Sequence, residues 1–239
     1  MRIALIGYGK MGRLIEEMAI AKGHEIVLKV SSSNLDAFTV ENFSMADVAI
    51  EFTSPEAAFE NVRKCMDAGI AVVSGSTGWN DRMEDARKYC IEKNTAFLHS
   101  SNFSIGVNIF FEINKQLAEL MSDQTDYDVQ IKEIHHTAKK DAPSGTAVTI
   151  AEQILSKLEW KKQWVKAKTQ SPEDLFIKSE RTDPAPGTHL IKYSSDIDDI
   201  EIIHTAHNRK GFASGAIAAA EFIAGKKGVF TMREVLGVS

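Results

Sequence analysis

Short apolar runs alternate with amphipathic segments along the first hundred residues of the chain. The runs have the length of buried strands, and they lie at residues 2–6, 25–30, 46–52, 70–73 and 96–98. Between these runs, apolar residues recur three and four positions apart, which is typical of helices with one buried face. A regular alternation of strand and helix predicts a Rossmann-like, doubly wound parallel sheet of the α/β class.

The pattern changes after Gly106, where we expect a hinge. Helical spacing covers 107–121, an alternating strand covers 129–134, and a second helix presents its apolar face from Ala147 onwards. Two further alternating segments are expected to be antiparallel strands, at 189–193 and 200–206. This part of the chain is therefore expected to form a smaller α+β domain.

Two segments complete the pattern. Residues 157–187 are polar and contain several prolines, so we expect them to be irregular. The last thirty residues return to helical spacing, with an alanine-rich helix over 213–224, Gly225 at its end, and a short helix capped by Thr231.

A glycine-rich loop follows the first strand directly. Its sequence, Gly7-Tyr8-Gly9-Lys10-Met11-Gly12, stands between a strand and a helix, the context that dinucleotide binding requires. Counting about 20 residues onwards leads to Ser32 and Ser33, where an NAD-specific site usually has an acid. Because no acid occurs between Glu25 and Asp36, the pattern favours NADPH or use of both nucleotides.

The stretch from Glu133 to Ala147 carries the most distinctive chemistry. Histidines and lysines precede Ser144-Gly145-Thr146, where a helix is expected to begin. Unpaired N–H groups at a helix start attract anions, and glycine lets a ligand come close. The stretch therefore suggests a cradle for a carboxylate or phosphate, although a surface loop with solvated lysines has the same composition.

The spacing Glu-Ile-His-His-x-x-Lys-x-Asp-Ala-Pro-Ser-Gly-Thr-Ala resembles the signature of the dihydrodipicolinate reductase (4-hydroxy-tetrahydrodipicolinate reductase) family. The resemblance implies NADPH- or NADH-dependent reduction of a cyclic imine dicarboxylate in lysine and diaminopimelate biosynthesis. It implies a catalytic pair, His135 and Lys139, and a set of substrate-binding residues: His136, Ser144, Gly145, Thr146 and Arg209.

The same resemblance assigns further cofactor contacts and a domain arrangement. Loops after three predicted strands are implied to line the nicotinamide end of the cofactor, through Phe52, Thr53, Gly75, Ser76, Thr77, Ser100, Asn102 and Phe103. A dinucleotide-binding domain is implied over 1–106 and 209–239, and a substrate-binding and oligomerisation domain over 107–208. A homotetramer is implied as well.

Composition narrows the possible partners. The net charge is −5, so no overall positive field draws the chain to nucleic acid or to anionic membranes. No apolar stretch approaches the roughly 18 residues of a membrane span. The two cysteines lack metal-ligand spacing and fit a reducing, cytoplasmic compartment. We expect no catalytic metal, because the histidine spacings are not those of a zinc site.

Two alternatives remain open at this point. Another amino-acid dehydrogenase, of an aspartate or homoserine type, would share the nucleotide fingerprint. A nucleotide-sensing module without catalysis would share it too. The His-His-x-x-Lys stretch argues against both, because neither needs histidines, lysines and a carboxylate cradle in one loop.

Overall fold

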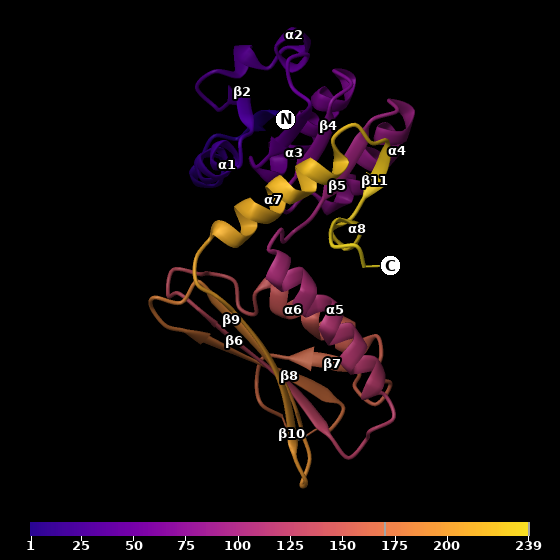
Figure 1. The fold of residues 1–239 in the computed structure, drawn as a ribbon. Helices are drawn as coiled ribbons and strands as arrows, with labels where there is room; N and C mark the ends of the chain where they lie inside the picture. Colours follow the sequence, from indigo (N-terminus) through magenta and orange to yellow (C-terminus); the bar gives the residue numbers. More distant parts are fainter. Residues whose placement is uncertain (170, 239) are drawn as a thin grey trace. The chain divides into compact units, whose positions relative to one another are not determined.

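The structure is a computed structural model, and it describes residues 1–169 and 171–238. The chain divides into two compact units, which are Met1–Ile105 with Lys210–Ser239, and Gly106–Arg209 (Figure 1). Each internal bound differs by one residue from the predicted domain limits, which were 1–106 with 209–239, and 107–208. Each unit is described by itself.

Unit 1 contains a parallel sheet in the order β11-β5-β4-β3-β1-β2. Its strands are β1 Arg2–Ile6, β2 Glu25–Val30, β3 Val48–Glu51, β4 Ala71–Ser74, β5 Ala96–His99 and β11 Gly228–Phe230. Its helices are α1 Lys10–Ala21, α2 Val40–Phe43, α3 Pro55–Asp67, α4 Met83–Glu92, α7 Lys210–Ile223 and α8 Met232–Val235, with 3-10 turns η1 Leu35–Ala37 and η2 Asn80–Arg82.

Helices cover both faces of this sheet, which confirms the doubly wound α/β class. Ile3 and Leu5 of β1 pack with α1 and α7, whereas Ala4 and Ile6 face the core that includes α3 and α4. Because a strand buried on both faces has no solvent-facing positions, its residues are apolar without interruption, as in the runs seen in the sequence. Strand β11, which was not anticipated, pairs with β5 and adds the returning C-terminal segment to the sheet.

Unit 2 contains a mixed sheet in the order β10-β9-β6-β8-β7. Its strands are β6 Asp128–His135, β7 Gln163–Val165, β8 Asp174–Arg181, β9 Gly187–Ser194 and β10 Asp199–Ala206, and its helices are α5 Ile105–Leu120 and α6 Gly145–Leu155. Strands β9 and β10 pair antiparallel, as expected, and β8 pairs parallel with β6. The helices α5 and α6 cover one face of this sheet (Figure 1).

The prediction that residues 157–187 are irregular was wrong. Strand β8 lies within them, and its buried Leu175 and Ile177 belong to the core of unit 2. Lys161 accounts for part of this order, because its buried ammonium donates to Asp128 Oδ1 at 2.6 Å and to the carbonyls of Pro172 and Asp174 at 2.8 Å. Lys161, which would be expected to be solvated in such a polar segment, therefore connects that segment to β6 through Asp128.

Candidate functional site

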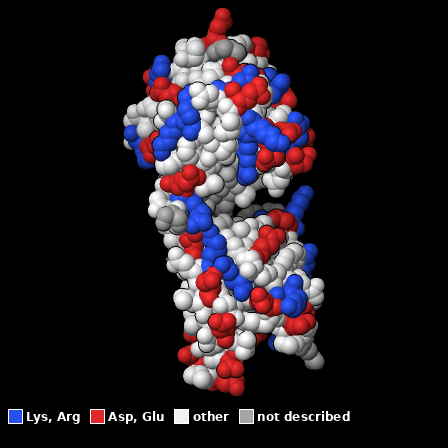
Figure 2. Space-filling model, turned by 90° about the vertical axis from the view of Figure 1, so that its right-hand side faces the viewer, with Lys and Arg blue, Asp and Glu red and all other residues white. Residues whose placement is uncertain are grey.

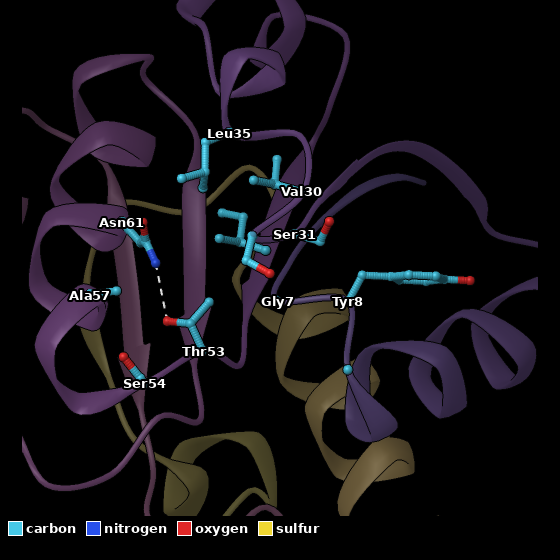
Figure 3. A pocket seen from close by; sticks show the side chains of 12 residues that line it. Gly7, Tyr8, Val30, Ser31, Leu35, Thr53, Ser54, Ala57 and Asn61 are labelled. Atoms are coloured by element: carbon cyan, nitrogen blue, oxygen red, sulfur yellow. Dashed lines mark hydrogen bonds between the residues drawn. The ribbon is translucent and has the colours of Figure 1, made fainter.

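A groove in unit 1 runs over the glycine-rich loop. One hollow of about 470 Å³ is lined by that loop, by the end of β2 and by α3 (Figure 3). A second hollow of about 450 Å³ shares Gly9 and Thr53 with the first, and it includes Phe52 and Gly75 to Thr77. Both lie at the carboxyl ends of parallel strands, where doubly wound folds bind their ligands.

The glycines fit a bound pyrophosphate. A Cβ on Gly7, whose φ is +93°, would lie 2.0 Å from the carbonyl oxygen of Phe52, and a Cβ on Gly12 would lie 2.3 Å from that of Gly7. Gly9, the N-cap of α1, instead faces open space: among the described residues, no heavy atom beyond its chain neighbours and its own helix backbone lies within 4 Å of the position of a Cβ. The first turn of α1 carries no acid, so its N-terminal partial charge is available to phosphate oxygens.

A buried glutamate that we did not anticipate organises this groove. Glu51 ends β3, is fully buried, and accepts hydrogen bonds from the Thr53 amide at 2.9 Å and from the hydroxyls of Ser74 and Ser76 at 2.5 and 2.7 Å. One carboxylate thus joins the loop after β3 to the loop after β4. Both loops line the second hollow.

The structure also places charged side chains around Tyr8 whose proximity could not be predicted from their positions in the sequence. The guanidinium of Arg13 and the ammonium of Lys29 lie 5.4 and 5.1 Å from the centre of the Tyr8 ring. Glu16 of α1 pairs with Lys29 at 3.1 Å and accepts a hydrogen bond from the Tyr8 hydroxyl. An acid therefore reaches this end of the groove from α1 rather than from the loop after β2.

The remaining predicted cofactor residues lie in different environments, and Ser100, Asn102 and Phe103 line neither of the two hollows. Ser32 lines the first hollow, and the hydroxyl of the exposed Ser33 lies 2.8 Å from that of Ser31. The Ser100 hydroxyl donates to the carbonyl of Asn102 at 2.8 Å. Phe103 is buried and packs on Phe52, with ring centres 5.8 Å apart. Their contacts with a cofactor remain predictions.

In unit 2, a cluster of polar side chains surrounds the end of β6. Val129, Ile131, Glu133 and His135 alternate onto the buried face of this strand, and the strand ends at His135. His136 follows it, is half-buried, and belongs to no strand. The rings of His135 and His189 meet edge to face with centres 5.1 Å apart.

Glu133 is at the centre of this cluster. It is fully buried, and its carboxylate accepts the Ser144 amide at 3.1 Å and Arg181 Nη2 at 3.2 Å. Burial alone raises the pKa of Glu133, but hydrogen bonds from Ser144, Ser179 and Arg181 outweigh that effect and hold the pKa below its ordinary value. The carboxylate is therefore ionised at neutral pH.

The two buried histidines respond to the same surroundings. Burial lowers the pKa of His135 below its ordinary value, and the Glu133 carboxylate opposes that change. Burial, with His135 nearby, lowers the pKa of His189 from 6.5 to about 3. Both rings are thus mostly neutral at pH 7.

The predicted anion cradle lies at the start of α6. Ser144 is the N-cap, its hydroxyl accepts the Ala147 amide at 3.2 Å, and His189 Nε2 lies 3.2 Å from the same oxygen. Since Ser144 is buried and engaged, the exposed Gly145 and the half-buried Thr146 present the helix start to solvent. Lys139 Nζ pairs with Asp141 at 2.8 Å.

Arg209 is the remaining predicted substrate residue. It lies in an exposed turn after β10, where unit 2 ends. Glu133, Arg181 and His189 were absent from the predicted site, although the structure brings them to its centre. The sequence did contain one indication of this cluster. Glu133 is an acid at a position of the alternating strand that is expected to face the core.

Ligand atoms of Glu133, His135 and His189 lie within 4.8 Å of one another, close enough to hold a metal ion. The carboxylate already has a positive partner, however, because Arg181 Nη2 lies 3.2 Å from it. A hydrogen-bonded cluster explains these contacts without a cation. That the site uses no metal remains a prediction.

The structure has two general features that bear on partners. On the face shown in Figure 2, positive and negative side chains are interspersed. Within residues 1–169 and 171–238, no helix combines the length and the apolar character needed to cross a bilayer.

Comparisons with known proteins agree across the whole chain. Residues 1–103 match the family model for the N-terminus of dihydrodipicolinate reductase, and residues 106–236 match the model for its C-terminus. A 4-hydroxy-tetrahydrodipicolinate reductase from Christiangramia forsetii is 47% identical over 99% of this chain and 98% of its own length. One from Methanoculleus marisnigri is 34% identical over 87% of this chain and 82% of its own length.

A solved structure supports the fold. Dihydrodipicolinate reductase from Paenisporosarcina, with dipicolinate bound, superposes with a TM-score of 0.78 at 21% identity, covering 98% of each chain. At that identity the likeness concerns the fold alone. The two family models and the full-length relatives confirm the resemblance seen in the sequence. The chain belongs to the dihydrodipicolinate reductase family of oxidoreductases.

Proposed function

We propose that the chain reduces 4-hydroxy-tetrahydrodipicolinate to tetrahydrodipicolinate with a hydride from a nicotinamide nucleotide and a proton, and that the 4-hydroxyl leaves as water, in lysine and diaminopimelate biosynthesis. Full-length relatives that carry this activity in their names support the proposal. The observation that carries it is the cluster in unit 2, where a buried histidine, a lysine and an exposed helix start lie on one short stretch. A planar dicarboxylate needs such cationic and N–H groups.

The site residues take distinct roles in this proposal. The nicotinamide, when bound, supplies the hydride. Lys139 and the start of α6 at Gly145 and Thr146 hold carboxylates, with Asp141 standing as the carboxylate partner of Lys139 before substrate arrives. His135 transfers a proton to the reduced ring system. His136 and Arg209 are proposed to flank the substrate, and Ser144 shapes the cradle.

Substitutions test these roles. Lys139→Ala should raise KM and lower kcat, and His135→Ala should lower mainly kcat, by roughly a hundredfold or more as for loss of a general acid. Lys140→Ala is the matched control, because its exposed neighbouring ammonium has no assigned role. Pyridine-2,6-dicarboxylate should compete with substrate in the control but bind poorly to Lys139→Ala. Near-normal turnover in both site variants would overturn the assignment.

A substrate panel separates the alternatives. Turnover with aspartate or homoserine, and none with the cyclic imine, would identify another amino-acid dehydrogenase. Tight NADPH binding without any turnover would identify a nucleotide sensor.

For the cofactor, we propose that NADPH is used at least as well as NADH. Arg13 and Lys29 place two positive charges around Tyr8, against one negative charge from Glu16, and Ser31 and Ser32 line the adjoining hollow. This balance accommodates a 2′-phosphate. A kcat/KM for NADH more than about tenfold above that for NADPH contradicts the proposal, since tenfold corresponds to about 1.4 kcal/mol of preference.

We further propose that the chain forms a homo-oligomer through unit 2. The family resemblance predicts that this oligomer is a tetramer. The edge strand β10 carries exposed apolar side chains, with Ile203 56% and Ile200 36% accessible. Uncovered strand edges and apolar faces favour association. Light scattering should give a multiple of the 26.4 kDa chain mass, and Ile203→Lys should reduce it. A fully active monomer at micromolar concentration would refute assembly.

We also expect a cytoplasmic location, to which the buried free thiols of Cys65 and Cys90 are suited.

A further inference from the structure

Glu133 holds together parts of unit 2 that are separate in sequence. Its carboxylate accepts hydrogen bonds from the amide of Ser144 at the start of α6 and from the guanidinium of Arg181 at the end of β8. It also lies 3.4 Å from Nδ1 of His135, on its own strand. We propose that Glu133 is a positioning residue of the reductase site, which orients the His135 imidazole and fixes the loop that carries Lys139. The inference rests on the function proposed above.

The loop between Lys139 and Ser144 is held at both ends. Arg181 Nη2 donates to the Asp141 carbonyl at 2.5 Å, and Arg181 Nε donates to the Lys139 carbonyl at 3.4 Å. The same guanidinium binds Glu133, which in turn accepts the Ser144 amide. Glu133 therefore holds the start of α6 directly, and it orients the guanidinium that holds the Lys139 backbone. Removing the carboxylate leaves the Ser144 amide without its acceptor and the Arg181 guanidinium with backbone carbonyls alone.

The second effect concerns the orientation of His135. Glu133 Oε2 lies 3.4 Å from His135 Nδ1, and the two atoms form no direct hydrogen bond. The negative charge of the carboxylate still favours a proton on Nδ1, the nearer ring nitrogen. A proton on Nδ1 leaves Nε2 as the nitrogen that exchanges a proton with a substrate. At metal and hydrolase sites a carboxylate fixes the imidazole tautomer through a direct hydrogen bond, whereas at 3.4 Å Glu133 acts on His135 through its charge.

The charges around His135 come from several elements. Besides Glu133, they are those of Lys139 and Asp141 in the loop and of Arg181 on β8, and the ring of His189 on β9 is neutral. The two positive charges disfavour imidazolium, and the two negative charges favour it. Without Glu133, burial and the remaining cations would disfavour the protonated ring further. A proton donor would then be available only at lower pH.

The test measures kcat against pH for the full-length wild type and Glu133→Gln, with saturating NADPH and freshly generated substrate. A general acid must be protonated, so kcat falls as pH rises through the pKa of His135. In Glu133→Gln we expect this fall at a pH at least about one unit lower, hence roughly tenfold less turnover above it, and a raised KM. NADPH binding, followed by fluorescence, should be unchanged.

Glu180→Gln is the matched control. Glu180 precedes Arg181 on β8, but its carboxylate pairs with Lys132 and Lys178 instead of the cluster. Its pH profile should match the wild type. Glu133→Asp keeps the charge with a shorter side chain, so it should give an intermediate midpoint, and it supplies the test if Glu133→Gln does not fold.

The outcomes separate this inference from the proposed function. If Glu133→Gln is merely less stable, and its pH profile is that of the wild type, Glu133 has a structural role and the inference is overturned. A wild-type midpoint in Glu133→Asp, where Glu133→Gln does not fold, overturns it as well. His135→Ala is measured in parallel. Wild-type turnover in His135→Ala contradicts the proposed role of His135 itself, whereas its loss with an unchanged profile in Glu133→Gln contradicts the positioning role alone.

Discussion

Acid should destabilise this protein through His189 before most carboxylates are protonated. His189 is buried on β9, and its pKa falls from 6.5 in the unfolded chain to about 3 in the folded one. Because the folded state binds this proton more weakly, the unfolded state gains protons first as pH falls. The stability contributed by neutral His189 is complete above pH 6.5 and is lost progressively between 6.5 and about 3.

The size of the effect follows from the two pKa values. Between pH 7 and pH 5, protonation of His189 in the unfolded chain lowers the free energy of unfolding by about 2 kcal/mol. Urea denaturation at the two pH values measures this loss. His189→Gln removes the titrating group but keeps an amide that can reach Ser144. The pH-dependent loss should therefore be about 2 kcal/mol smaller in His189→Gln.

His204, whose pKa burial also lowers, is present in the wild type and in the variant, and its contribution largely cancels in the comparison. His135 lies beside His189, with ring centres 5.1 Å apart, so the titrations of the two rings are coupled. His135→Gln and the double variant, measured at the same two pH values, separate the two contributions. If the wild type and His189→Gln lose the same free energy between pH 7 and pH 5, His189 is not held neutral by burial, and the electrostatic description of the cluster is wrong.

Three further predictions concern other parts of the molecule. Gly7→Ala should abolish NADPH binding and lower the free energy of unfolding by at least about 1–3 kcal/mol, because its Cβ would lie 2.0 Å from the Phe52 carbonyl at a φ of +93°; normal NADPH affinity, measured by calorimetry, would contradict this. Lys161→Ala should lower that free energy by roughly 1–3 kcal/mol, since it strands the carbonyls of Pro172 and Asp174; an unchanged urea midpoint would show that water replaces the ammonium. Cys65, fully buried and with a thiol pKa raised well above its usual range by burial, should react with a thiol reagent only after unfolding; rapid labelling of the native protein, read by mass spectrometry, would refute that.

The sequence was sufficient to predict most of unit 1, because both faces of its sheet are covered. Strands buried on both faces are continuous apolar runs, and strands such as β1 and β4 stand out against polar surroundings. Strand β11 was missed because three residues, Gly228–Phe230, carry no periodicity to read. Its place depends on pairing with β5, a contact across most of the chain.

Unit 2 was harder to predict for a related reason. Strand β8 alternates, with Leu175 and Ile177 inward, but prolines and charged residues surround it. Its order comes partly from Lys161, whose burial cannot be seen from a lysine in a polar segment. Tertiary contacts outweighed local composition there.

The candidate site shows the same limit. Motif spacing selected His135, Lys139 and Ser144, because they lie on one stretch. Arg181 and His189 reach Glu133 from β8 and β9, more than forty residues along the chain. Such contacts depend on strand order, which the pattern did not specify. The roles of all these residues remain predictions.

The central claim is that this chain transfers a hydride to a cyclic imine dicarboxylate. The most direct test incubates the purified chain with NADPH and freshly generated 4-hydroxy-tetrahydrodipicolinate, and follows nucleotide absorbance and product mass together. The account predicts one tetrahydrodipicolinate formed for each NADPH oxidised, with little oxidation by Lys139→Ala. NADPH oxidation without that product, or none at all by a folded protein that binds NADPH, would contradict it.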